Sequence, residues 1–164
     1  MEHRRHSVLA EGLDAGLIGG SAVALWFLVR DLLAGHPLRT PSVLGELFLY
    51  GNPQPDTAGT VFGAVVVYTA LHFVLFVAFA VAVAAVVRLS AQSALARFGL
   101  LMLFVIFELF FYVAVNLMSA TVGALFPMWT VLAANLFAAV AMGFYFRQRY
   151  PEMRGVLREE PLGV

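Results

Sequence analysis

Two ionisable side chains interrupt long apolar stretches of this 164-residue chain: His72 lies in YTALHFVLF and Glu108 lies in FVIFELFF. Imidazole and carboxyl groups can carry protons, and burial shifts the pKa values of both. A charged side chain at the centre of a bilayer costs about 2.5–3.5 kcal/mol on insertion scales, so such residues usually face the protein interior and pair. The two groups are therefore either structural partners inside the protein or members of a site that moves protons or binds a ligand.

Counting along two consecutive predicted helices places both residues at similar depth. At 1.5 Å per residue, Glu108 lies roughly 15 Å from the inner start of its helix, and His72 lies roughly 16 Å from the outer start of its own. In an apolar layer about 30 Å thick, both reach the midplane, so we expect them to contact each other. Residues four apart on a helix share a face, which adds further polar members. The predicted buried polar cluster consists of His72, Glu108, Tyr68, Tyr112, Asn116 and Asn135.

Other site chemistries have weaker support in the sequence. The chain has no cysteine, which excludes disulfides and thiolate metal sites. A metal site built from His72 and Glu108 alone would lack ligands, so no metal is predicted. A b-type haem held by two histidines is disfavoured because His3, His6 and His36 all lie outside the predicted spans. No cofactor is predicted, with haem and quinone sites as the weaker alternatives.

The composition is that of an integral membrane protein. Hydrophobic residues make up 62% of the chain and charged residues 12%, against roughly 45–50% and about 25% in soluble proteins. The apolar residues form four blocks, each near the length of about 20 residues that a membrane-spanning helix needs. We therefore predict a single all-α domain over residues 1–164, a four-helix bundle in the membrane. Its spans are expected at about 13–34, 61–87, 98–119 and 126–146. The first is interpreted as an uncleaved helix, since its small residues lie inside the apolar run.

The predicted connections are uneven in length. Residues 35–60 form the long one, a proline-rich extracytoplasmic loop in which Thr40 and Pro41 are typical of a helix start. Apolar residues then recur at helical spacing, which predicts a short amphipathic helix at the membrane surface. A loop folded over the end of the bundle is the alternative. Residues 147–164 are predicted to form a charged cytoplasmic tail.

Arginine placement predicts the orientation. All ten basic residues are arginine. Those on one side of a four-span chain are Arg4, Arg5, Arg88, Arg97, Arg147, Arg149, Arg154 and Arg158. Only Arg30 and Arg39 fall on the other side, so both termini are expected to be cytoplasmic. The arginine bias, with many Ala, Val, Leu and Gly residues, is typical of GC-rich bacteria and favours a bacterial inner membrane. The formal net charge of zero gives no reason to expect a nucleic-acid partner.

Small residues indicate where helices pack closely. Gly12, Gly16, Gly20 and Ala24 recur every four residues in the first span, and Asn135, Ala139 and Gly143 do so in the last. Such spacing in lipid predicts a tight helix contact, either within the chain or with another copy.

A second polar group, the outer-loop polar site, begins at the outer end of the first span and continues into the loop: Arg30, Asp31, His36 and Arg39. Arg30 and Asp31 are adjacent and so point in different directions around the helix. Asp31 is expected to face inward, and Arg30 either extends to the lipid headgroups or forms a site.

The segments WFLVRDLLAGHPLRTPSVLG and YTALHFVLF resemble a group of small four-helix membrane proteins from GC-rich bacteria. The matching positions are Trp26, Phe27, Asp31, Gly35, Pro37, Leu38, Thr40, Pro41, Leu44, Gly45, Tyr68, Thr69, His72 and Phe73. The resemblance covers about the first half of the chain. It implies the four-helix architecture and carries no activity.

These features favour a non-catalytic accessory or assembly subunit, surrounded by lipid and packed against other membrane subunits or copies of itself. The alternative is a small proton-coupled transporter or channel component that uses His72 and Glu108. A membrane enzyme or quinone-site protein using Tyr68, His72 and Glu108 is a weaker third possibility.

Overall fold

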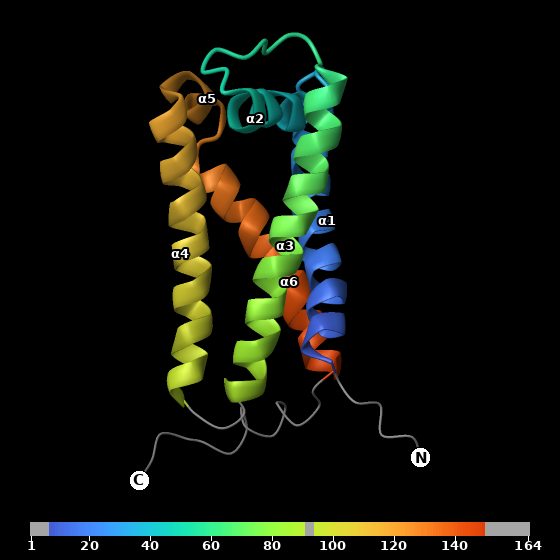
Figure 1. The fold of residues 1–164 in the computed structure, drawn as a ribbon, viewed down its shortest axis with the longest axis vertical. Coiled ribbons are helices and arrows are strands. Elements are labelled where there is room, and N and C mark those ends of the chain that lie inside the picture. Colours follow the sequence, from blue (N-terminus) through green and yellow to red (C-terminus); the bar gives the residue numbers. More distant parts are fainter. Residues whose placement is uncertain (1–6, 91–93, 150–164) are drawn as a thin grey trace.

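The computed structural model describes residues 7–90 and 94–149, and every regular element among them is a helix. In order these are α1 (Val8–Leu33), α2 (Arg39–Tyr50), α3 (Phe62–Ser90), α4 (Ala94–Met118), α5 (Ala120–Leu125) and α6 (Met128–Arg149). Four long helices form the body of the molecule, and the two short ones, α2 and α5, lie together at one end of it (Figure 1). The all-α prediction is confirmed. The predicted tail falls almost entirely beyond Arg149, outside the described residues.

Among the described residues, three helices are long and apolar enough to cross a membrane: α1, α3 over Phe62–Arg88, and α6. Each is long enough to cross a hydrocarbon layer about 30 Å thick at 1.5 Å per residue. These helices are those of a membrane-embedded protein. In α4, the described apolar stretch is the shorter segment Glu108–Met118.

The glycine stripe of α1 packs against α3 of the same chain. A Cβ atom built on Gly16 would lie 2.5 Å from Val77 Cα, and one on Gly12 would lie 2.6 Å from Val81 Cα. At Gly20 the nearest atoms belong to the Phe73 ring, at 3.0 Å. The backbones of α1 and α3 therefore approach as closely as the spacing predicted, and the partner helix is internal.

The corresponding stripe on α6 behaves differently. Asn135 is buried, whereas Ala139 and Gly143 are exposed, and a Cβ atom on Gly143 would meet nothing within 4 Å. Helix α6 packs against α1 through another face, where Met142 reaches Gly19. The spacing of small residues therefore predicted a close contact of α1, which the structure shows to be internal, whereas the same spacing in α6 gives no close contact at Ala139 and Gly143 within the described residues.

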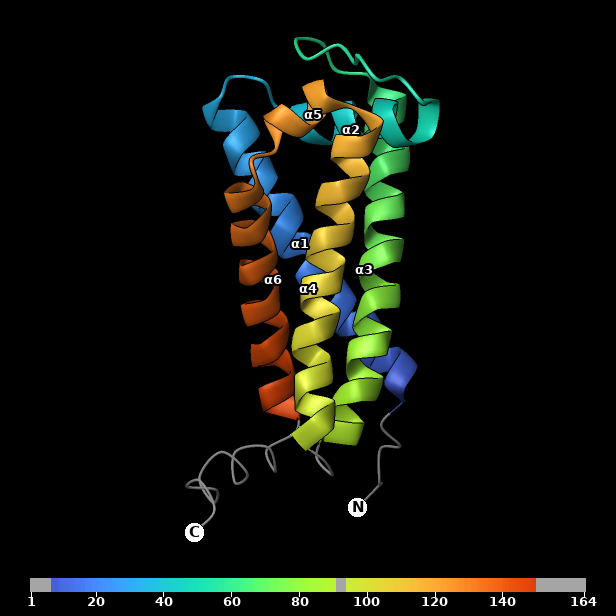
Figure 2. The ribbon, with the colours of Figure 1, turned by 90° about the vertical axis from the view of Figure 1, so that its left-hand side faces the viewer.

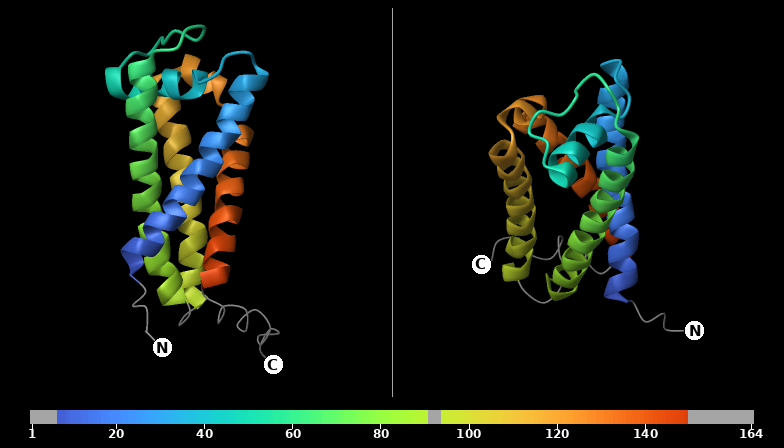
Figure 3. Two further views of the ribbon diagram at one scale, coloured as in Figure 1. Left: turned by 90° about the vertical axis from the view of Figure 1, so that its right-hand side faces the viewer. Right: turned by 45° about the horizontal axis from the view of Figure 1, so that its top comes forward.

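Helix α2 lies across one end of the bundle and is buried in it (Figure 3). Val43, Leu44 and Leu47 are at most 2% exposed, and a Cβ atom on Gly45 would lie 2.5 Å from the Ala64 carbonyl oxygen of α3. The predicted short helix exists, but its apolar face meets the bundle and not lipid. The segment is therefore helical, as the first alternative predicted, and it is folded over the end of the bundle, as the second predicted for a loop. We call this end of the molecule the α2 end.

The start of α2 differs from the predicted one. Leu38 has a positive φ of 66° and precedes the first helical residue, Arg39, so Thr40 is the second residue and Pro41 the third. Proline is tolerated there because the first backbone N–H groups of a helix have no partner within the helix. Thr40 is therefore not the N-cap that its sequence position predicted.

Helix α5 occupies the short connection left between the last two predicted spans, 98–119 and 126–146. Ser119 is its N-cap, since the Ser119 hydroxyl oxygen accepts a hydrogen bond from Val122 N at 3.1 Å. The same hydroxyl donates to the Pro53 carbonyl oxygen at 2.7 Å. Ser119 thus connects α5 to the loop that follows α2.

Candidate functional site

His72 is hydrogen-bonded to α1 and not to Glu108. Its Nε2 lies 3.0 Å from the Gly20 carbonyl oxygen, and since a carbonyl can only accept, Nε2 carries the proton and donates. The ring packs beside Phe76, with centroids 4.7 Å apart, and the Tyr68 ring lies 6.2 Å away. This bond spans the α1 and α3 contact at the glycine stripe. The predicted pairing of His72 with Glu108 is therefore wrong.

Glu108 instead joins α4 to α6. Asn135 donates a hydrogen bond from Nδ2 to Glu108 Oε2, and both residues are at least nine-tenths buried. The other carboxyl oxygen, Oε1, is buried and has no hydrogen-bond partner among the described residues. The sequence placed both residues in the polar cluster, and the structure brings these two together. Glu108 is tolerated in its apolar helix because it faces the bundle and is hydrogen-bonded there.

The six predicted cluster residues do not form one network. Asn116 is exposed and donates to the Tyr112 carbonyl oxygen of its own helix at 2.8 Å. His72 bonds to α1 and has the Tyr68 ring beside it, whereas Glu108 bonds to α6. Counting residues gives the depth of a side chain along its helix, but it does not give the direction in which the side chain points around the axis. That missing angle is why residues of equal depth have different partners.

An ionic group at the opposite end of the bundle was missed by the sequence reasoning. Glu11 of α1 is 1% exposed. Its Oε2 lies 3.4 Å from Nη2 of Arg88 in α3, and its Oε1 lies 3.9 Å from Nε of Arg149 in α6. Beside it, the Tyr145 hydroxyl donates to the Asp14 carboxylate at 3.0 Å. We call this the Glu11 end. The available signal was an acidic pair at the start of the first span, on the side where most arginines were expected to gather.

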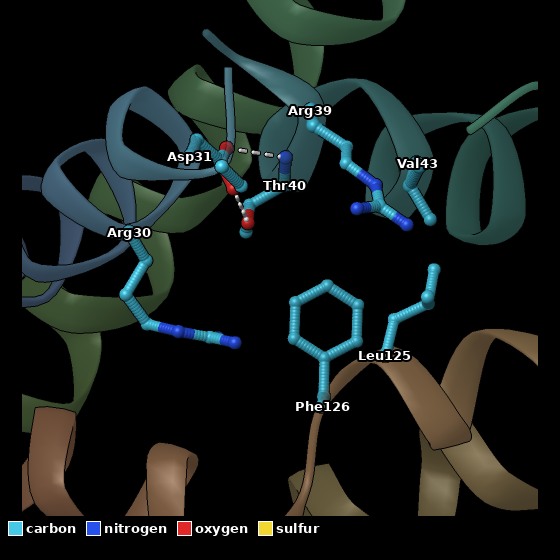
Figure 4. A pocket seen from close by; sticks show the side chains of 8 residues that line it. Arg30, Asp31, Arg39, Thr40, Val43, Leu125 and Phe126 are labelled. Atoms are coloured by element: carbon cyan, nitrogen blue, oxygen red, sulfur yellow. Dashed lines mark hydrogen bonds between the residues drawn. The ribbon is translucent and has the colours of Figure 1, made fainter. Parts of the chain in front are cut away.

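The outer-loop polar site is partly assembled by the structure. Asp31 is 6% exposed, and its two carboxylate oxygens accept from Thr40 N at 2.6 Å and from Thr40 Oγ1 at 2.8 Å. These bonds hold the start of α2 against the end of α1 (Figure 4). Arg30 and Arg39 line a cleft beside this contact. His36 is exposed in the turn and is not part of the cleft lining.

The described residues contain no group of three or more His, Cys, Asp or Glu side chains that could hold a metal ion. Together with the three apolar helices, these sites define a membrane-embedded helical protein whose polar side chains connect its helices. No protein-family model, no curated protein and no solved structure matches the chain.

Proposed function

We propose that the chain is a non-catalytic, four-span membrane protein that acts as an accessory or assembly subunit of a larger membrane complex or of a homo-oligomer. One observation carries the proposal: three of the four acidic side chains that are buried in the described residues bond from one helix to another. Glu11 reaches α3 and α6, Glu108 meets α6, and Asp31 holds α2. Polar groups committed to such contacts favour a structural role over catalysis.

The proposed fourth span is α4. Helix α4 runs beside α3 from the Glu11 end to the α2 end, where α5 begins (Figure 2). Its described apolar stretch, Glu108–Met118, extends toward the α2 end. With four spans, the start of α1 and the end of α6 lie on the same side of the membrane.

The proposed orientation places the Glu11 end in the cytoplasm and the α2 end outside. Arg88, Arg147 and Arg149 lie at or near the Glu11 end of their helices, and arginines gather on the cytoplasmic side of membrane proteins. With the bacterial character of the composition, this favours an inner-membrane protein with cytoplasmic termini.

The subunit proposal is tested by mass. Cross-linking in intact native membranes, followed by mild extraction and native mass spectrometry, should give a discrete particle heavier than the 17.8 kDa chain. The matched control is the same chain expressed alone in a foreign host. A heavier particle in both hosts indicates a homo-oligomer, and one in native membranes alone indicates a complex with other subunits. A monomer in both would rule out the proposal.

A proton-coupled role is the second candidate, now centred on Glu108 without His72. It is favoured by Glu108 Oε1, which is buried and has no hydrogen-bond partner in the part of the chain that the structure describes. Glu108→Gln removes the titratable group while an amide oxygen can still accept from Asn135. Purified protein in liposomes carrying a pH-sensitive dye separates the two roles. A proton flux that exceeds protein-free liposomes and disappears in Glu108→Gln would support this candidate, whereas an accessory subunit gives no such flux.

A further inference from the structure

The cleft at the α2 end is lined by Arg30 and Arg39, the two arginines that the sequence places on the opposite side from the other eight. Arg30 lies in the last turn of α1 and Arg39 is the first residue of α2. Both line one small, open cleft with about 60 Å³ of space inside it. Pockets that enclose drug-sized ligands span roughly 300–1,000 Å³, so this cleft has room for a group of a few atoms and not for a bulky molecule.

The two guanidinium groups have no carboxylate partner among the described residues. Asp31 is the acidic residue of the cleft, and both of its oxygens already accept hydrogen bonds from Thr40. Arg30 instead lies over the Phe27 ring, with its guanidinium carbon 5.7 Å from the ring centroid. Two cations thus face one carboxylate that is already hydrogen-bonded, and the cleft carries an excess of positive charge.

The start of α2 contributes charge to the cleft but few donors. A helix N-terminus carries partial positive charge, which favours an anion nearby. Here, however, Thr40 N donates to Asp31, Arg39 N donates to the His36 carbonyl oxygen at 3.2 Å, and Pro41 has no N–H group. The hydrogen-bond donors available to a ligand are therefore those of Arg30 and Arg39.

The remaining wall of the cleft is apolar. Val43 of α2, Leu125 of α5 and Phe126 complete it, and in Figure 4 the two arginine side chains approach the Phe126 ring from different sides. Arginine binds phosphate oxygens with paired N–H donors, which a point charge such as lysine cannot reproduce. Two arginines above an apolar wall match a group that joins a phosphate to hydrocarbon.

We propose that Arg30 and Arg39 form a binding site for a phosphate group at the α2 end of the bundle. Two sources share this chemistry: the headgroup of a phospholipid, whose acyl chain would follow the apolar wall, and free phosphate from solution. Asp31 is a positioning residue, because its bonds to Thr40 bring Arg39 to the end of α1.

The test measures ligand-induced thermal stabilisation of the purified full chain in a neutral detergent. The probes are a short-chain phosphatidylglycerol, inorganic phosphate, and a diacylglycerol of the same chain length without phosphate. We expect the phosphate-bearing lipid to raise the melting temperature and the diacylglycerol to have no effect. Stabilisation by the lipid alone identifies a headgroup site, and equal stabilisation by inorganic phosphate identifies a phosphate site.

The variants assign the effect to the cleft. Arg30→Gln and Arg39→Gln should each weaken the apparent affinity about tenfold or more, since hydrogen bonds to charged groups are the strong ones. Arg39→Lys keeps the charge and should still weaken binding, which separates paired donation from simple attraction. The matched control is Arg147→Gln, an exposed arginine on α6. The proposal is overturned if no phosphate-bearing probe stabilises the wild type, or if the cleft variants bind as tightly as the control.

Discussion

At the α2 end a helix is buried across the bundle, whereas at the Glu11 end arginines from α3 and α6 reach one buried carboxylate. The α2 end combines apolar burial of Val43, Leu44 and Leu47 with two short hydrogen bonds from Thr40 to Asp31. The Glu11 end relies on charge, and its arginines keep 32% and 38% of their side chains exposed. Both ends hold α1 in place, but by forces that respond differently to water and salt.

The difference teaches where a carboxylate stabilises the fold most. Both oxygens of Asp31 are used by a single partner residue in a buried setting, so removing them leaves two buried donors unsatisfied. The arginines around Glu11 are half-exposed and can turn to water or to lipid headgroups when their partner is lost. Two buried acids of α1 should therefore contribute unequally.

The largest effect is expected from Asp31→Ala. Loss of two hydrogen bonds to a charged acceptor should lower the free energy of unfolding by about 3 kcal/mol. The measurement is the thermal midpoint of the full chain in one fixed detergent. The control is Asp31→Asn, whose amide can accept from Thr40 N and donate to Thr40 Oγ1, and which should lose about 1 kcal/mol. Equal losses in the two variants would show that the Thr40 bonds contribute little.

A smaller effect is expected from Glu11→Gln. The amide fills the same volume but removes the charge that faces Arg88 and Arg149, at a cost of about 1 kcal/mol. The same detergent assay applies, with Asp14→Asn as the exposed neighbouring control. A loss as large as that of Asp31→Ala would remove the contrast between the two ends.

Added salt should weaken the contribution of the Glu11 end to stability and leave that of the α2 end unchanged, with little effect on the free energy of unfolding as a whole. Screening weakens interactions of partly exposed charges, and the Debye length falls from about 10 Å at 0.1 M to about 3 Å at 1 M. Raising NaCl over this range should therefore reduce the stability difference between wild type and Glu11→Gln. The difference between wild type and Asp31→Ala should stay constant, since that contact is buried. A salt response of equal size at both ends contradicts the comparison.

The smallest effect on stability is expected from a change at Asp56, in the loop that follows α2. Hydrogen bonds from the backbone N–H groups of Ala58 and Gly59 hold the pKa of this exposed carboxyl below its ordinary value of 3.8. A carboxyl whose pKa is lower in the folded state stabilises the fold at pH values above its pKa in the unfolded chain. This stabilisation is lost as the pH falls through the pKa of the folded state. NMR titration of the Asp56 carboxyl should give a pKa below 3.8, and Asp56→Asn should leave the thermal midpoint at pH 7 nearly unchanged. A normal pKa would mean that this turn is not formed in solution.

Local patterns in the sequence predicted the helices and one of their contacts. Apolar run lengths predicted the ends of α1, α3 and α6 to within five residues, and the spacing of Gly12, Gly16 and Gly20 predicted the close approach of α1 to a neighbour. Both depend on residues near each other in the chain. The six-residue helix α5 was missed, since a helix that short has too few residues to show a repeat.

The candidate site was harder to predict because it depends on contacts between distant residues. The depths of His72 and Glu108 follow from counting, but their partners depend on how each helix is rotated in the bundle. Asp31 and Thr40 were both singled out by the sequence, and their bond was missed because the turn between them decides whether they meet. That turn needs positive φ angles at Gly35 and Leu38, of which the glycine alone is a recognisable signal.

The hydrogen bond from Ser119 to Pro53 sets an order of events as the growing chain enters the membrane. Its two ends are 66 residues apart, and Pro53 emerges from the ribosome long before Ser119. Contacts of α2 with Asp31 and with Ala64 can form as soon as α3 is in place. The Pro53 carbonyl, by contrast, lacks its donor Ser119 until α4 has been made in full and its end lies beside the loop after α2. Closure of this end is therefore a late step of biogenesis, completed by a segment from the second half of the chain.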